Sequence, residues 1–294
     1  MDIESHGRTG HLPITVTGPP SGSRVAIAGD VSSQFISALM MIGPRLPSGL
    51  GIELTSDLVS VPYVELTASV MEWFGIGDVE IDRRAVLVPA GDYRPVDMAI
   101  EPDASSASYP LALAAVVGGR VGITGLGLTS RQGDARFAAL LAQMGCGVTR
   151  TADRTVVELG HRLVGIDVDM ADISDLVPTL AVVASCASTP SRIRGVGFIR
   201  AKESDRLGDL VHELRTLGVD LDETDDGLDI RPSAAALHGG HVATHHDHRL
   251  AMAFAVIGSR VPGVYVADPD VVAKSWPGFW HVLDAVGRQR VGDR

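Results

Sequence analysis

Aromatic residues, cysteines, lysines and long hydrophobic runs are all scarce in this chain of 294 residues. Aromatic residues make up only 4%, so aliphatic side chains must form most of the core. Cys146 and Cys186 have no C-x-x-C or Cys/His spacing, which argues against a disulfide scaffold or a zinc site and favours a reducing cytoplasm. The sequence has no window of about 18 uncharged apolar residues and no basic-then-apolar start, so we expect neither a membrane span nor a signal peptide.

Positive charge is also in the minority, with 25 Lys and Arg against 36 Asp and Glu and a net charge of −11. This charge repels nucleic acids and anionic membranes, so we expect neither as a partner. Only two basic residues are lysines, Lys202 and Lys274. Arginine therefore supplies generic positive charge, and these two lysines are candidates for positions that need a compact ammonium group, chance survival being the alternative.

Four similar segments of about 70 residues make up most of the chain. Their length and the 45% apolar composition indicate a globular protein of about two domains. In the first three segments an Asp/Ser-rich start precedes an apolar run, and Asp30, Asp103 and Asp172 are 73 and 69 residues apart. Such self-similarity predicts a repeated folding unit. A second helical pattern ends each segment at a glycine, these being Gly75, Gly145, Gly218 and Gly287.

The pattern inside each segment predicts a βαβαββ unit of the α/β class. The first helix is apolar nearly all round and should be buried, whereas the second is amphipathic and should end at its glycine in the C′ position. Short β-branched runs and strand pairs, such as those from Val79 and Val219, supply the strands. We divide the chain near residues 96 to 101 into a leader (1–13), a single unit (14–98) and a domain of three units (99–294).

The helix starts are the candidate functional positions, because free backbone N–H groups there bind anions. Ser32, Ser33 and Gln34 begin the first helix and combine such N–H groups with side-chain donors. Ordinary helix capping is the alternative, and we interpret the equivalent serines of 105–108 as caps only. Asp175 follows Asp172 in a carboxylate-rich helix start. Burial or like charges would raise the pKa of one of these carboxylates and make it a general base, although acidic residues also suit helix N-termini.

The densest motif is RAKESDRL, at residues 200 to 207. Lys202 and Arg206 are four residues apart, which would place them on one helix face beside Glu203. These three side chains could bind two anions and transfer a proton, or form a surface ion-pair network.

The HHDHRLAM stretch places His248 and Arg249 at the start of a fourth helix. Three histidines and an aspartate suggest a metal, but neighbouring residues around a helix cap do not converge as the i,i+4 pair of a zinc helix does. We therefore expect no metal there. Lys274 precedes the last helix, where it is either an anion ligand or a solvated loop lysine.

Together these segments resemble the 5-enolpyruvylshikimate-3-phosphate (EPSP) synthase family from about Leu12 to Gly287. A sister enolpyruvyl transferase that acts on UDP-N-acetylglucosamine shares the fold, but the SSQF, KESDR and DHR motifs favour the shikimate branch. The matching motifs are SSQF at Ser32, SDLVSVPYVELT from Ser56, EPDASSASY from Glu101, SRQGDARFAALLAQMG from Ser130, DMADISD from Asp169, KESDRL from Lys202, DHRLAM from Asp247 and AKSWP from Ala273.

The resemblance implies an inside-out α/β barrel fold with two domains of three βαβαββ units each, closing on substrates across a cleft. It also implies transfer of the enolpyruvyl group of phosphoenolpyruvate to the 5-hydroxyl of shikimate 3-phosphate, with no metal or organic cofactor. In this reaction protonation of the methylene carbon makes C2 electrophilic, the deprotonated hydroxyl attacks it, and the tetrahedral intermediate then loses phosphate.

Matching the motifs position by position implies a role for each candidate residue. Asp175, Lys202 and Glu203 are the implied catalytic residues, with Asp175 taking the proton of the 5-hydroxyl. The implied ligands of shikimate 3-phosphate are Ser32, Ser33, Gln34, Ser60, Asp175 and Lys202. The implied ligands of phosphoenolpyruvate are Gln34, Arg206, Arg249 and Lys274. Both lysines of the chain are thus part of the implied site.

Two departures from the family pattern limit this expectation. Phe198 stands where the family often has Asn or His, and two further units with a Lys-Ser pair, a Gly-Thr turn and additional arginines are not found, so four of six units are present. Losing about three charge-assisted contacts of roughly 1.5 to 3 kcal/mol each would weaken substrate binding at least a thousandfold. We therefore expect an enolpyruvyl transferase that is inactive without the missing units, which another polypeptide or a longer gene product would supply. The alternative is a non-catalytic truncated homologue that self-associates or weakly binds phosphorylated ligands.

Overall fold

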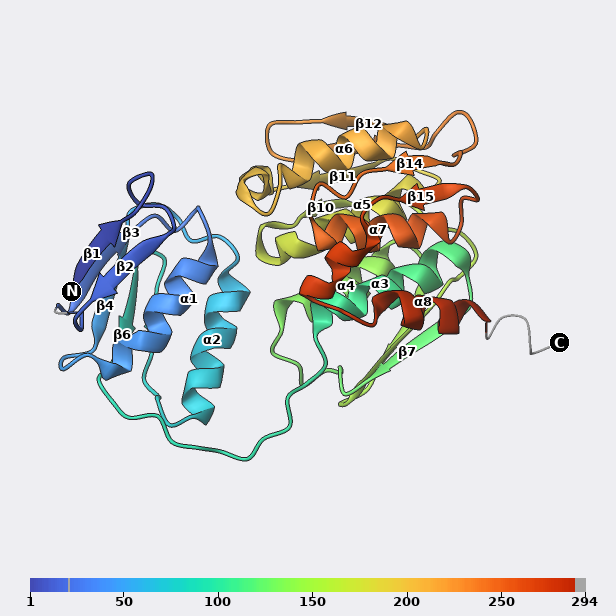
Figure 1. The fold of residues 1–294 in the computed structure, drawn as a ribbon. Coiled ribbons are helices and arrows are strands. Elements are labelled where there is room, and N and C mark those ends of the chain that lie inside the picture. The colour runs from blue at the N-terminus through green and yellow to red at the C-terminus, as the bar shows by residue number, and fades with distance from the viewer. Residues whose placement is uncertain (21, 289–294) are drawn as a thin grey trace. The chain divides into compact units, whose positions relative to one another are not determined.

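The structure is a computed structural model that describes residues 1–20 and 22–288 (Figure 1). The chain forms two compact units, Met1–Met98 (unit 1) and Ala99–Arg294 (unit 2), and each is described by itself. Across the described part of the chain, the helices are too short or too polar to cross a bilayer.

Unit 1 contains a small hairpin followed by one complete βαβαββ unit. The hairpin strands β1 and β2 are antiparallel, and β1 lies within the segment 1–13 that we interpreted as a leader. The following sheet has the order β3-β4-β6-β5, in which β3 and β4 are parallel and β6 is antiparallel to both β4 and β5. The elements are β1 (Asp2–Ser5), β2 (Ile14–Thr17), β3 (Arg24–Ile27), α1 (Ser33–Ile42), β4 (Leu50–Leu54), α2 (Val61–Trp73), β5 (Glu80–Ile81) and β6 (Ala85–Val88).

The helices of unit 1 begin and end as the sequence predicts, but one of them is less buried than expected. Ser32 caps α1 by accepting a hydrogen bond from the backbone N–H of Gln34, and Gly75 follows α2 with a φ of 91°. Ile36 and Met40 of α1 are fully buried, whereas Phe35 and Met41 are more than half exposed. The prediction that the apolar first helix is buried on all sides is therefore wrong for α1, which buries one face within unit 1.

Unit 2 contains three sheets and a group of buried helices (Figure 1). One sheet has the order β10-β11-β13-β12, a second has β7-β9-β8, and β14 pairs in parallel with β15. The elements are α3 (Ala104–Val117), β7 (Arg120–Thr124), α4 (Phe137–Gln143), β8 (Gly147–Arg150), β9 (Arg154–Glu158), β10 (Asp167–Asp169), α5 (Val177–Ser185), β11 (Ser191–Arg194), α6 (Arg206–Thr216), β12 (Asp220–Glu223), β13 (Leu228–Arg231), β14 (Gly240–Val242), α7 (His248–Gly258), β15 (Val264–Val266) and α8 (Phe279–Arg288).

The repeat is visible in the topology. The segment from β10 to β13 has the same strand order and directions as the segment from β3 to β6, so two complete βαβαββ units are present. In the described residues, the segment from α3 to β9 has no opening strand, and the segment from β14 to α8 has no closing strand pair. Gly145 and Gly218 follow their helices with φ of 96° and 83°, as predicted. Gly287 lies inside α8, so the prediction that it ends the last helix is wrong.

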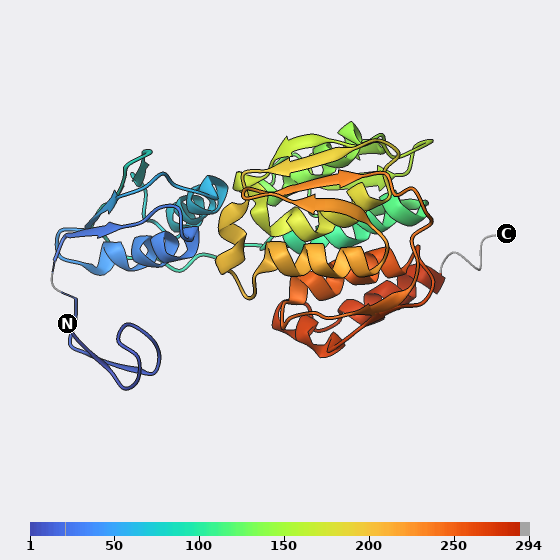
Figure 2. The same cartoon turned by 90° about the horizontal axis from the view of Figure 1, so that it is seen from above.

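The core of unit 2 is formed by α3, α5 and α7, which pack against one another and run side by side in Figure 2. Every residue of α5 is buried, as is nearly every residue of α7. Their side chains are mostly Ala, Val and Leu, because three helices this close leave little space for larger groups. The predicted burial of the first helix in each segment is confirmed for these three helices. Polar side chains are consequently concentrated at the helix ends.

Candidate active site

Arg206 lies at the end of unit 2 where α5, α6 and α7 begin, and it is completely buried. It is the first residue of α6, and Asp205 caps this helix by accepting a hydrogen bond from the backbone N–H of Gly208. Its guanidinium group donates to three carboxylates, each from a different stretch of the chain. Nη1 lies 3.1 Å from Asp175, Nε lies 2.6 Å from Asp247, and Nη2 contacts Glu203.

Two further cations bind the same carboxylates. Arg249 donates from Nη2 to the second oxygen of Asp175 at 2.7 Å, and Lys274 donates from Nζ to Glu203 at 2.5 Å. Arg249 is on the first turn of α7, and Lys274 ends the 3-10 helix Pro269–Lys274. The Nζ atom of Lys202 lies 5.8 Å from the centre of the Phe198 ring. We call Asp175, Lys202, Glu203, Arg206, Arg249 and Lys274, together with Asp247, the Arg206 cluster.

The structure brings together all six candidate residues of unit 2, but not by the predicted local geometry. Lys202 follows the 3-10 helix Gly197–Ala201, and α6 begins only at Arg206. The prediction that Lys202 and Arg206 share a helix face is therefore wrong. A bend between the two helices turns Glu203 back toward Arg206 instead.

The surrounding charges hold both candidate acid–base groups in their ionised form. Burial disfavours a charged Asp175, but Arg249, Arg206 and Lys202 outweigh it and lower its pKa. The prediction of a raised pKa for Asp175 is therefore wrong for the free protein. Burial likewise opposes the charge of Glu203, and Lys274 and Arg206 outweigh it and lower its pKa to about 2.

Asp247 of the cluster and two residues beside the cluster were not assigned roles from the sequence. Asp247 is completely buried; one of its oxygens accepts from Arg206 and the other caps α7 by accepting from the backbone N–H of Arg249 at 2.8 Å. Its position before an apolar helix is a capping signal that sequence reasoning could have used. His248 is 4% exposed, its Nδ1 has no hydrogen-bond partner in the described structure, and burial together with Arg249 lowers its pKa.

Tyr109 of α3 completes this set. Its hydroxyl is hydrogen-bonded to Arg249, and burial raises its pKa to about 12. A buried tyrosine needs a polar partner, so its presence in a mostly apolar helix was the available signal.

The cluster is suited to binding anions. It contains four cations and three carboxylates, so it carries one net positive charge in a chain whose net charge is −11. The side chain of Lys274 is 54% exposed and that of Arg206 is 1% exposed, so the cluster extends from the interior to the surface. An incoming phosphate or carboxylate would compete with Asp175 and Glu203 for Arg249 and Lys274.

The other candidate residues lie in unit 1, at the edge of the sheet where parallel strands β3 and β4 end. The loops after these strands are held together by Ser56, whose hydroxyl accepts from the backbone N–H of Gly29 at 2.9 Å and donates to Asp30 at 2.6 Å. Ser32 begins α1 after the first loop, and Ser60 precedes α2 after the second. Such an edge is where open α/β sheets bind ligands.

These unit 1 candidates differ in exposure and conformation. Gln34 is exposed and Ser33 is 6% exposed. Ser60 is buried and has φ 56° and ψ 42°, a left-handed conformation that is unfavourable for a residue with a Cβ. Backbone strain of this kind is often retained where a loop positions a functional group.

Comparison with known proteins agrees with this fold. The fold is shared with the enolpyruvyl transferase NikO from Streptomyces tendae, with a TM-score of 0.70 and 19% identity over 93% of this chain and 65% of that one. It is also shared with the EPSP synthase from Acinetobacter baumannii, with a TM-score of 0.77 and 25% identity over 97% of this chain and 67% of that one. The molecule thus has an enolpyruvyl transferase fold. The model of the EPSP synthase (3-phosphoshikimate 1-carboxyvinyltransferase) family matches residues 1–283, and the chain belongs to this family.

Curated relatives carry the same description. A 3-phosphoshikimate 1-carboxyvinyltransferase from Methanoculleus marisnigri is 43% identical over 97% of this chain and 68% of its own length. One from Nostoc sp. is 42% identical over 95% of this chain and 66% of its own length. The chain therefore spans about two thirds of the length of these relatives.

Proposed function

We propose that the chain takes part in transfer of the enolpyruvyl group from phosphoenolpyruvate to the 5-hydroxyl of shikimate 3-phosphate. The observation that supports this proposal is the Arg206 cluster, in which carboxylates and several cations lie together at one end of unit 2. The two substrates are small anions, and binding them side by side requires such a local excess of cations. Membership of the family supports the same activity.

In this proposal Arg249, Lys274 and Arg206 bind the carboxylate and phosphate of phosphoenolpyruvate, together with Gln34. Arg249 and Lys274 are bonded to Asp175 and Glu203 in the free protein. Substrate binding would exchange these internal carboxylates for those of the ligand. Asp175 would then lose a neighbouring cation, its pKa would rise, and it would become a better acceptor for the proton of the 5-hydroxyl.

Shikimate 3-phosphate would be bound by Ser32, Ser33, Gln34 and Ser60, with Lys202 and Asp175. The serine hydroxyls and the backbone N–H groups at the start of α1 suit a phosphate, which would compete with the Ser32 hydroxyl for the N–H of Gln34. Lys202 supplies a compact cation, and Glu203 shares the proton transfers with it. We also propose, as the family resemblance implies, that the reaction uses neither a metal nor an organic cofactor.

We further propose that the isolated chain does not catalyse this reaction. The curated relatives are longer, and the motifs with a Lys-Ser pair and additional arginines are not in the printed sequence. The chain would then supply four of six repeat segments, two of them as complete βαβαββ units, and activity in the cytoplasm would require the remaining segments.

A phosphate-release assay with both substrates tests this function. We expect no release by the purified chain alone, and release when the missing units are co-expressed with it. A titration with shikimate 3-phosphate should show weak binding that Lys202→Ala reduces further. If neither substrate binds the chain at millimolar concentration and co-expression restores no activity, the proposal is wrong.

The exposed face of α1 favours a second candidate, self-association of a non-catalytic homologue. Phe35 and Met41 are 54% and 52% exposed, and Ile42 lies beside them at 47%. The helix in the equivalent topological position of unit 2, α5, is buried throughout. Sedimentation of the chain at increasing concentration should reveal dimers or larger species that Met41→Glu abolishes. A monomer at all concentrations would exclude this candidate.

A further inference from the structure

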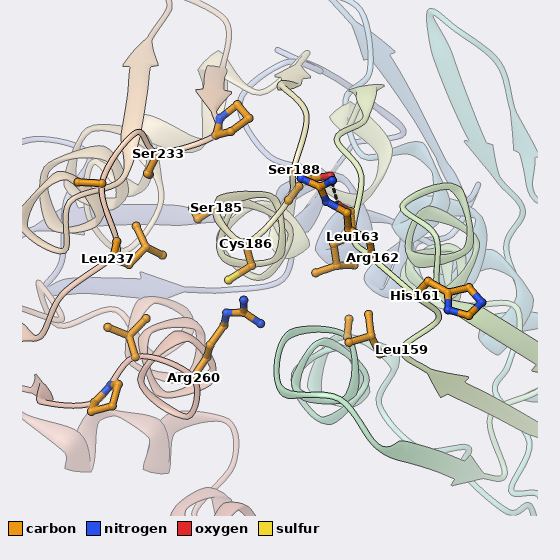
Figure 3. A pocket seen from close by; sticks show the side chains of 17 residues that line it. Leu159, His161, Arg162, Leu163, Ser185, Cys186, Ser188, Ser233, Leu237 and Arg260 are labelled. Atoms are coloured by element: carbon orange, nitrogen blue, oxygen red, sulfur yellow. Dashed lines mark hydrogen bonds between the residues drawn. The ribbon is translucent and has the colours of Figure 1, made fainter.

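Unit 2 has a pocket of about 630 Å³ at the end of its helices opposite to the Arg206 cluster (Figure 3). Ala115 near the end of α3, Cys186 just after α5 and Arg260 just after α7 contribute to its lining. The cluster lies at the starts of α5 and α7. Because α7 has 11 residues, its two ends are roughly 16 Å apart. The pocket is therefore separate from the candidate active site.

The charges around the pocket all have the same sign. Arg162 and Arg260 line it together with His161, and none of its described lining residues is an aspartate or glutamate. In a chain with 36 acidic and 25 basic residues, this is opposite to the overall balance. Figure 3 shows the guanidinium group of Arg260 directed into the pocket near Cys186. Within the described structure neither arginine forms an ion pair, so both positive charges are available to a ligand.

Arg260 has one internal role that accounts for only part of its hydrogen-bonding capacity. Its Nη1 donates to the carbonyl oxygen of Val116 at 2.8 Å, which caps the end of α3. A guanidinium group has five N–H donors, so several remain for a ligand. Capping of α3 requires only Arg260. It therefore does not explain why a second arginine, Arg162, lines the same pocket.

The remaining wall is partly apolar and partly made of small hydroxyl groups. Leu163, Leu237 and Val261 contribute apolar surface, and Ser233 adds a hydroxyl. Ser188 is already used, because its hydroxyl donates to the carbonyl oxygen of Leu163 at 2.8 Å. Pockets that bind small ligands typically have volumes of about 300 to 1,000 Å³ and combine apolar walls with a few polar groups.

We propose that this pocket binds a small organic anion, with a carboxylate or phosphate held by Arg260 and Arg162 and a compact apolar body held by the leucines and Val261. An inorganic anion would use only the arginines, and an uncharged ring would use only the apolar wall. A ligand with both parts should therefore bind more tightly than either. This inference does not depend on the proposed transferase function, because binding is measured directly.

Cys186 supplies a local readout of occupancy. Burial raises the pKa of its thiol to about 11, and the positive charge of Arg260 opposes this shift. The thiol lines the pocket, so a bound ligand should shield it from an alkylating reagent. Cys146 is buried outside this pocket and serves as an internal comparison.

The test is a calorimetric titration of the chain with phenyl phosphate, inorganic phosphate and benzyl alcohol. We expect phenyl phosphate to bind most tightly and to slow the alkylation of Cys186. Arg260→Gln and, separately, Arg162→Gln should weaken its binding about tenfold or more, because each removes a charge-assisted contact. Arg154→Gln is the matched control, since Arg154 is exposed on β9 of the same unit and lies outside the pocket.

Three results would overturn the proposal. The first is no binding of phenyl phosphate at millimolar concentration, and the second is unchanged affinity in both pocket variants when their circular dichroism spectra are native. The third is loss of phenyl phosphate binding in the Arg249→Gln variant. The last result would place the probe in the Arg206 cluster. None of these results bears on whether phosphoenolpyruvate binds the cluster, so failure here leaves the proposed function open to its own test.

Discussion

Asp247 joins the starts of two helices through one carboxylate, with Oδ2 accepting from Nε of Arg206 at 2.6 Å and Oδ1 accepting from the backbone N–H of Arg249 at 2.8 Å. A single aspartate thus caps α7 and neutralises the buried cation at the start of α6. The sequence motif that contains it therefore has a structural role besides the proposed anion-binding one. Because of this double role, we expect substitution of Asp247 to destabilise the chain.

Asp247→Asn should destabilise the chain by about 3 to 5 kcal/mol, because Arg206 is left buried beside one fewer negative charge. Asparagine still caps a helix, so the loss reports the ion pair and not the cap. Urea denaturation measures the change. The control is Asp229→Asn, which breaks an exposed pair with Arg192 and should have a much smaller effect. Equal losses in the two variants would contradict the structure.

Acid should destabilise the chain in two pH ranges. The pKa of His248 is lowered from about 6.5, so the unfolded chain takes up this proton first and the contribution to stability is lost as pH falls below about 6.5. The pKa of Glu203 is lowered to about 2, so its contribution is lost between about pH 4.5 and 2. Free energies of unfolding measured against pH should show both slopes. His248→Asn should flatten only the upper one, and an unchanged upper slope would argue against a buried neutral His248.

Ser60→Gly should give a chain about 1 kcal/mol more stable than Ser60→Ala. Both substitutions remove the hydroxyl, but only alanine retains the Cβ that is unfavourable at a φ of 56°. Thermal denaturation of the two variants measures the difference directly. Equal stability would show that the residue does not adopt the left-handed conformation.

Tyr109→Phe should lower the free energy of unfolding by about 1 to 2 kcal/mol, because it removes the buried hydroxyl that is hydrogen-bonded to the side chain of Arg249. Tyr265→Phe is the comparison, since Tyr265 is 61% exposed. Denaturation midpoints of the two variants provide the measurement. A loss in Tyr265→Phe as large as that in Tyr109→Phe would be inconsistent with the hydrogen bond.

Much of the fold was predictable because short-range sequence features mark the repeated elements. The N-cap at Ser32 and the glycines after three helices are short-range features, and the apolar composition of α3, α5 and α7 indicated their burial. The end of the last helix was not predictable from Gly287, since a glycine marks a helix end only when the backbone turns left-handed there. Nor could spacing show that α1 keeps one apolar face exposed, because burial depends on neighbouring segments.

The candidate site was predictable in its residues but not in its geometry or charge state. Motif matching selected the six residues that meet around Arg206, yet the i,i+4 rule placed Lys202 on the wrong element. The lowered pKa of Asp175 depends on Arg206 and Arg249, which are 31 and 74 residues away along the chain. Such long-range electrostatics follow from tertiary structure and are not visible in a local pattern.

The most direct test of the account is a titration of the chain with phosphoenolpyruvate, comparing the unmodified protein with Arg249→Gln. If the Arg206 cluster binds the substrate anions, Arg249→Gln should weaken binding about tenfold or more, whereas Arg120→Gln on the exposed strand β7 should leave it unchanged. Equal affinity of the unmodified chain and Arg249→Gln would contradict the assignment of this cluster as the anion-binding site.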